Sequence, residues 1–179
     1  MRGLVFLSGY KWMLEQGHGE RYRGLLPAGR LRDGIATITA AEWVSIEDAL
    51  VVYATCDALG LSFDEQVAAG RAVSAANNGI LVTTVARLVG KLASPWTGLS
   101  HLDKAWQRSN RGGAVAVYKL SERQARLELW RVPLARSPFF VTSMRGAIAA
   151  GIEPFCGRLV VNDLPDQAID DGFAFRLTW

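Results

Sequence analysis

The spacing of hydrophobic residues changes near residue 113, and this change divides the chain into two kinds of predicted structure. Before it, apolar residues recur at helical spacing, which predicts a helix over residues 4–15 and a long helix from Phe63 toward Leu92. After it, "AVAVYKL", "ARLELWRV", "GRLVVND" and "GFAFRLTW" have the alternation and composition of strands. The predicted order is four to six helices followed by β-β-α-β-β, which is an α+β fold.

Serine residues mark the starts of three predicted helices. Ser45 and Ser62 each stand three positions before an acidic residue, a capping-box pattern in which hydroxyl and carboxylate bind each other's backbone N–H groups. Ser137 precedes Pro138, and proline suits the first position of a helix because its missing N–H would have no partner there. The helix after Ser137 is predicted to carry four apolar residues on one face: Phe140, Met144, Ile148 and Ile152.

Glycine, proline and asparagine predict where helices stop. We expect a kink or a break in the long helix at residues 77–79, where Asn-Asn-Gly interrupts the pattern. Loops are predicted at "PAGRLRDG" and "SPWTGLS", and a short helix follows over residues 101–107. Residues 1–107 are therefore predicted to be mainly helical, and residues 108–179 to form the β-β-α-β-β part. Together they make one predicted domain over residues 1–179.

Composition and charge narrow the class of protein. The net charge of +3 comes from 20 basic and 17 acidic residues that are dispersed along the chain, so nucleic-acid binding is not expected. Two cysteines are too few for a disulfide framework or a zinc cluster. The apolar run of residues 4–7 is too short for a signal segment, and no run is long enough to span a membrane. We therefore expect a cytoplasmic protein.

The loop "RSNRGG" before the first strand is the candidate for an anion site. Arg108 and Arg111 could bind an acidic group together with backbone N–H groups of the loop. The same residues are typical of a solvated entrance to a hairpin, and no helix starts after the glycines to support a phosphate. We favour the hairpin entrance. The chain contains no motif for a metal site or a catalytic residue, so an enzyme is the less favoured class.

Several segments together resemble a known family. "GLVFLSGYKWML", "LSFDEQVAAGRA", "WQRSNRGG", "SPFFVTSMRGAIAAGIEPFCG" and "FAFRLTW" occur in the order and spacing of a myxobacterial paralogous family of unknown function. That family sits near the vinyl-4-reductase domain, the haem-nitric-oxide-binding domain and the Bet3-like subunits of transport tethering particles. The resemblance covers most of the chain. It implies helices lying over a four-stranded antiparallel sheet, with an apolar cavity between the layers in several relatives.

The haem-binding residues of these relatives indicate whether haem is expected in this chain. Haem-nitric-oxide-binding domains hold haem through a histidine and its carboxylates through Tyr-x-Ser-x-Arg, and no tyrosine of this chain begins that motif. His18 stands in a Gly-His-Gly turn and His101 in a polar loop, whereas a haem ligand needs an imidazole fixed in an apolar pocket. We therefore expect no cofactor, and haem in particular is not expected.

Two functions follow from the resemblance. The favoured one is a non-enzymatic regulatory or sensory domain that binds a small apolar ligand between helices and sheet, with Trp106, Phe140 and Met144 as pocket residues. The alternative is a homodimeric assembly or interaction module with a packed core and no ligand. A homodimer is expected in either case, because relatives pair through helices and the first helix is apolar around much of its circumference.

Overall fold

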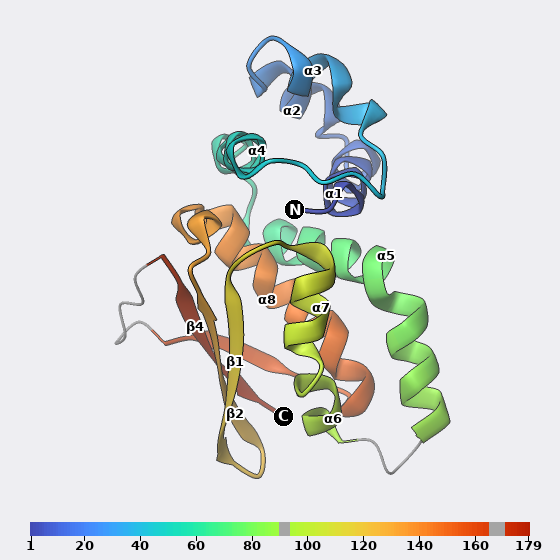
Figure 1. Ribbon diagram of the computed structural model, residues 1–179, viewed down its shortest axis with the longest axis vertical. Helices are drawn as coiled ribbons and strands as arrows, with labels where there is room; N and C mark the ends of the chain where they lie inside the picture. Colours follow the sequence, from blue (N-terminus) through green and yellow to red (C-terminus); the bar gives the residue numbers. More distant parts are fainter. Residues whose placement is uncertain (90–93, 165–170) are drawn as a thin grey trace.

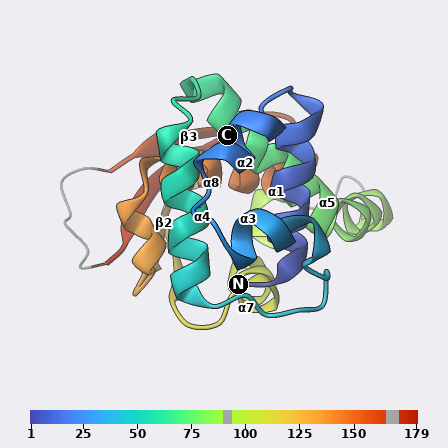
Figure 2. The same ribbon diagram turned by 90° about the horizontal axis from the view of Figure 1, so that it is seen from above.

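The chain folds into a cap of helices above a second layer, in which further helices cover one face of a sheet (Figure 1). The computed structural model describes residues 1–89, 94–164 and 171–179, and for residues 78–89 it describes the backbone alone. The cap contains α1 (Gly3–Glu15), α2 (Gly19–Leu25), α3 (Arg30–Gly34), the 3-10 helix η1 (Ile35–Thr37) and α4 (Ile46–Ala58). Seen from above, these elements lie over the remainder of the chain (Figure 2).

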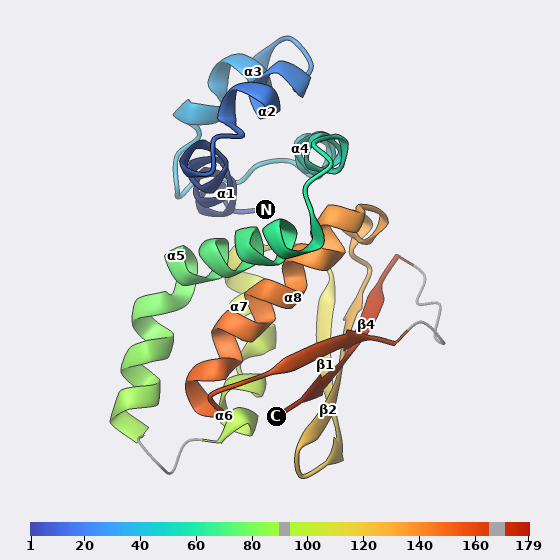
Figure 3. The same ribbon diagram turned by 180° about the vertical axis from the view of Figure 1, so that it is seen from behind.

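The second layer contains the long helix and the sheet. Its helical elements are α5 (Phe63–Val89), α6 (Pro95–Leu99), α7 (Leu102–Ser109), η3 (Pro133–Arg136), α8 (Pro138–Ile152) and η4 (Glu153–Phe155). Its strands are β1 (Ala114–Ser121), β2 (Gln124–Trp130), β3 (Val160–Asp163) and β4 (Phe173–Thr178). Helices α7 and α8 lie on the same side of the sheet (Figure 3). The predicted α+β fold, with helices against a four-stranded antiparallel sheet, is confirmed.

The sheet has the strand order β1-β2-β4-β3, and every neighbouring pair is antiparallel. In its register Leu127 of β2 lies between Val117 of β1 and Phe175 of β4. Successive side chains of a strand point to opposite faces, so Leu127, Phe175 and Leu177 share the face toward the helices. All three are at most 1% exposed. The alternation seen in the last strand therefore places its large side chains in the core.

The predicted serine caps are present at all three helices. The Ser45 hydroxyl accepts from the Asp48 N–H at 3.1 Å, and the Ser137 hydroxyl accepts from the Phe140 N–H at 3.1 Å. At α5 the exchange is reciprocal, because the Ser62 N–H donates to the Glu65 carboxylate at 2.7 Å and the Glu65 N–H donates to the Ser62 hydroxyl at 3.3 Å. Such caps satisfy backbone groups that have no partner within the helix.

Two predicted loops are helical instead. "PAGRLRDG" contains the whole of α3, and "SPWTGLS" contains α6, which Ser94 and Pro95 start with the same signal as Ser137 and Pro138. Of the kink or break expected at residues 77–79, the break is absent, because α5 continues to Val89 as one helix that bends along its length (Figure 3). The Asn77 side chain donates to the Val73 carbonyl at 2.8 Å, and bonds of this kind are compatible with a bent helix. The predicted end near Leu92 lies outside the described residues.

Glycines allow α5 and α8 to cross with their backbones in contact. A Cβ atom on Gly70 would stand 1.8 Å from the Ser143 carbonyl oxygen, and one on Gly146 would stand 1.9 Å from the Val67 carbonyl oxygen. Because each glycine faces main chain of the other helix, no side-chain rotation could relieve the overlap. This crossing fixes α8, whose apolar face forms part of the candidate site described below.

An ion pair also joins α5 and the C-terminal end of α8. The Arg71 guanidinium donates to both oxygens of Glu153, at 2.6 and 2.9 Å. These hydrogen bonds hold the pKa of Glu153 below its ordinary value of 4.5. A carboxylate with a lowered pKa stabilises the folded protein above the ordinary pKa, and this stabilisation is lost as the pH falls through the folded value.

Glu153→Gln is therefore expected to lower the free energy of unfolding by about 1 kcal/mol at pH 7, a value kept small because both partners are partly exposed. The difference from the wild type should shrink as the pH falls below 4.5, because the wild-type carboxyl then takes up its proton. Urea unfolding at a series of pH values checks this. A difference that stays constant down to pH 3 would contradict the assigned role of the ion pair.

Candidate functional site

A cavity of about 460 Å³ lies between the helical cap and the second layer, and it is partly open to the surface. Its walls come from α1, α4, α5, α7, α8 and the first two strands, so residues far apart in the sequence meet there. The walls are mainly apolar. Side chains from four of these helices show the composition: Phe6, Met13, Val52, Val73, Phe139 and Ile148. A cavity of this size and lining is typical of a small-molecule site.

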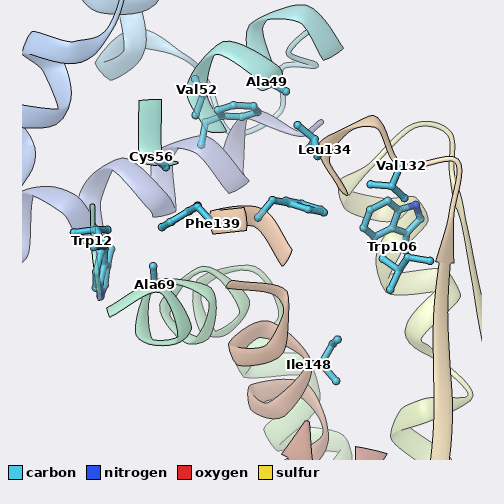
Figure 4. Packing of buried hydrophobic residues seen from close by; sticks show 14 of the residues in the cluster. Trp12, Ala49, Val52, Cys56, Ala69, Trp106, Val132, Leu134, Phe139 and Ile148 are labelled. Carbon is cyan, nitrogen blue, oxygen red and sulfur yellow. The ribbon is translucent and has the colours of Figure 1, made fainter. Parts of the chain in front are cut away.

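All three residues predicted to line a pocket are in its wall. Trp106 of α7 donates its indole N–H to the Gly112 carbonyl at 2.9 Å, which fixes the ring (Figure 4). Phe140 is 2% exposed, and its ring meets that of Tyr53 edge to face with centroids 5.1 Å apart. Met144 follows Phe140 by one turn of α8. These residues therefore surround a cavity and do not fill it.

The two arginines of "RSNRGG" lie apart. Arg108 is in the last turn of α7 and lines the cavity. Arg111 instead lies against the ring of Trp43, with 4.2 Å between the guanidinium carbon and the ring centroid. Gly112 and Gly113 have positive φ angles of 81° and 71°, which glycine adopts without strain, and they lead the chain into β1. The two glycines thus form the entrance to the hairpin, and Arg108 stands in a different environment from Arg111.

Two further polar residues of the wall were not predicted. His101, the residue before α7, is exposed and lines the cavity, as does Lys104 one turn later. His18 lies elsewhere and pairs with Glu65, with 3.3 Å between its Nε2 and a carboxylate oxygen. His101 and Lys104 are exposed polar residues, so no apolar pattern in the sequence marked them as part of the cavity wall.

Uncharged hydrogen-bonding groups stand at the end of the cavity near the cap. Tyr22, Tyr53 and Cys56 all line it. Burial raises the pKa of all three groups well above their ordinary values, because desolvation penalises their charged forms. At neutral pH they are therefore two phenols and a thiol without charge. A neutral thiol is not an activated nucleophile, so Cys56 contributes packing and a weak hydrogen-bonding group.

The arrangement of helices on one face of an antiparallel sheet, with an apolar cavity beside them, defines a class of α+β ligand-cavity fold. It is the fold of the H-NOX proteins. The structure of the Fe(II) unliganded H-NOX protein from K. algicida is similar, with a TM-score of 0.69, 12% sequence identity, and coverage of 99% of this chain and 96% of that chain. A variant of the H-NOX protein from T. tengcongensis has a TM-score of 0.60, 12% identity, and coverage of 99% and 97%.

A third similar structure, from work on haem distortion in the H-NOX family, has a TM-score of 0.65 and 12% identity and covers 100% of this chain and 95% of that chain. At this identity the likeness establishes the fold alone. No family model and no curated protein matches the chain.

These neighbours contradict the expectation of no cofactor. The similar structures are H-NOX proteins studied for their iron and haem, so the comparison points to haem, contrary to the expectation from the sequence. As the sequence indicated, His101 is exposed and stands in the turn before α7, but this residue also lines the apolar cavity, which the sequence did not predict.

Two other properties can be stated for the described part of the chain. Within residues 1–89, 94–164 and 171–179, no group of three or more histidine, cysteine, aspartate or glutamate side chains is placed to hold a metal ion. None of the described helices combines the length and the apolar character needed to cross a membrane.

Proposed function

We infer that the protein is a non-enzymatic sensory domain whose cavity holds a ligand, and that this ligand is haem bound through His101. The observation that carries the inference is an apolar cavity of about 460 Å³ that has the exposed residue His101 among those that line it, within a fold shared with H-NOX proteins. The alternative of a closely packed core without a ligand leaves that cavity unexplained.

The residues of the cavity fit haem in two respects. His101, at the exposed edge of the cavity, would hold haem through its imidazole, a side chain that binds haem iron in many proteins. The apolar walls from α5 and α8 suit a flat hydrophobic ring, and the neutral phenols of Tyr22 and Tyr53 add hydrogen-bonding groups without charge. Bound haem would supply an iron with a coordination position open to a small gas molecule. The protein's own part is to hold the ring, exclude water and transmit occupancy through α8 and the cap.

A hemin titration followed by absorption tests the inference. The wild type is expected to give the Soret band of histidine-bound haem at one equivalent. His101→Gly should weaken binding by about a hundredfold. Glycine is tolerated at the start of a helix, so the fold should persist. Millimolar imidazole should restore the band to this variant, because it can occupy the space left by the side chain.

His18→Gly is the matched control, because His18 lies outside the cavity wall, and it should bind hemin as the wild type does. Equal hemin affinity in wild type and His101→Gly would contradict the assignment of the ligand, as would the absence of any binding by the wild type.

Assembly, location and family remain proposals. A homodimer through helical surfaces agrees with Leu14 of α1, Leu25 of α2 and Leu50 of α4, which are 48%, 42% and 38% exposed. The apolar circumference of α1 supports it less than the sequence suggested, since Trp12 and Met13 are buried within the chain. We also propose a cytoplasmic location and membership of the myxobacterial family that the chain resembles.

A further inference from the structure

We propose that Lys104 and Arg108 form a carboxylate-binding site at the edge of the cavity, so that the ligand carries one or more carboxylates on an apolar body. The proposal rests on the proposed function in one respect, namely that the cavity is the ligand site. It does not require the ligand to be haem.

Both cations of α7 line the cavity. From His101 to Asn110 every residue lines the cavity except Asp103 and Gln107. Lys104 and Arg108 are four residues apart, so they are neighbours on one side of the helix. Asp103 and Gln107 form a second pair beside them, in which the Gln107 amide donates to the Asp103 carboxylate at 2.8 Å. The two cations therefore stand together at the cavity, and the acid of this helix does not line it.

The charged side chains of fixed sign in the described cavity wall are all positive. Among the described residues, Lys104 and Arg108 are the charged side chains of fixed sign that line the cavity, and no aspartate or glutamate lines it. Within the same part of the chain, neither side chain takes part in an ion pair or a hydrogen bond. A cavity with apolar walls and two cations at one edge is complementary to an apolar molecule with an anionic end.

Lysine and arginine side chains both suit the edge of an apolar cavity, because each combines an apolar stem with a charged end. Lys104 and Arg108 are exposed, yet each contributes to the cavity wall. Long basic side chains lay their aliphatic stems along apolar surface and keep their charged ends in water. An apolar body would thus lie inside against the stems, and its carboxylate would meet the charged ends at the opening. Arginine binds a carboxylate with two parallel hydrogen bonds, and lysine adds a third donor.

The spacing along α7 gives the ligand an orientation. Arg108 follows His101 by seven positions, which is about 10 Å along the helix axis. The imidazole and the guanidinium would therefore bind different parts of one ligand. Haem meets this description, with iron at the centre of the ring and two carboxylates on its rim, and these cations would replace the Tyr-x-Ser-x-Arg motif that the chain lacks. A fatty acid, with one carboxylate on an acyl chain, presents the same chemistry to Lys104 and Arg108.

The test compares acids with their esters on the full chain. Hemin, hemin dimethyl ester, palmitate and methyl palmitate are titrated against the wild type and the double variant Lys104→Gln/Arg108→Gln, by absorption for the hemins and by tryptophan fluorescence for the lipids. The control Lys11→Gln/Arg21→Gln removes the same charge from exposed residues that do not line the cavity. Loss of two charge-assisted bonds should weaken binding of the acid by about tenfold to a hundredfold. Binding of the ester should not change, and the control should match the wild type.

The outcomes separate the carboxylate site from the haem assignment. Hemin that binds wild type and Lys104→Gln/Arg108→Gln equally would overturn the carboxylate site while leaving the haem cavity in place. Palmitate that binds in a manner dependent on these cations, with no binding of hemin, would uphold the carboxylate site and overturn haem. Failure of both acids to bind the wild type would overturn both proposals. An equal loss in Lys11→Gln/Arg21→Gln would reduce the effect to net charge and overturn the site.

Discussion

Gly146→Ala is expected to lower the free energy of unfolding by about 3 kcal/mol. The added Cβ would stand 1.9 Å from the Val67 carbonyl oxygen and 3.0 Å from the Arg71 backbone nitrogen. Both atoms belong to the main chain of α5, so relief requires α5 and α8 to move apart. Such a movement would also disturb the Arg71–Glu153 ion pair and the wall of the cavity.

The same helix provides the control for this experiment. A Cβ on Gly151 of α8 would meet no atom within 4 Å, so Gly151→Ala should leave the packing intact and raise stability by about 0.5–1 kcal/mol through helix propensity. Urea unfolding followed by circular dichroism measures both variants. A Gly146→Ala protein as stable as Gly151→Ala would contradict the close crossing of α5 and α8.

Phe175→Ala is expected to cost about 3–5 kcal/mol, which is a large part of the stability of a domain. Phe175 has no exposed surface and lies on the central strand β4 opposite Leu127. Its ring also meets the ring of Phe173, with centroids 5.2 Å apart. Truncation would leave a void at the centre of the sheet that surrounding helices could close only in part.

Arg176→Ala, at the next position of β4, serves as the comparison because that side chain is exposed on the opposite face. It should change the free energy of unfolding by no more than about 0.5 kcal/mol. Thermal unfolding of the two variants gives the comparison directly. Similar melting temperatures for Phe175→Ala and the wild type would show that β4 does not form part of the core.

Much of this fold could be predicted from short stretches of sequence, because the helix caps and the strand alternation were clear where they occurred. The serines at 45, 62 and 137 start helices through hydrogen bonds that depend on neighbouring residues alone. The alternation that leads to Phe175 and Leu177 reports the inner face of a strand whatever the partner strands are. Short helices are harder, because the few residues of α3 and α6 show too little of the helical period to outweigh their glycines and prolines.

The candidate site depended on long-range arrangement, and this is why part of it was missed. Trp106, Phe140 and Met144 could be proposed as pocket residues because large apolar side chains line cavities as well as cores. His101 and Lys104 become candidate site residues only through the placement of α7 beside the cavity, which no local pattern reports. The sequence does indicate the inward side of α7, through Leu102, Ala105 and Trp106, but residues 101, 104 and 108 are exposed and do not stand on that side.

Native mass spectrometry of the protein purified from cells that produce haem is the sharpest test of haem binding. We expect one non-covalent haem per chain in the wild type and little or none in His101→Gly, and the same spectrum reports whether the chains pair. A wild-type spectrum with no bound haem, from a protein that also takes up none when hemin is added, would contradict the proposal that the cavity is a haem site held by His101.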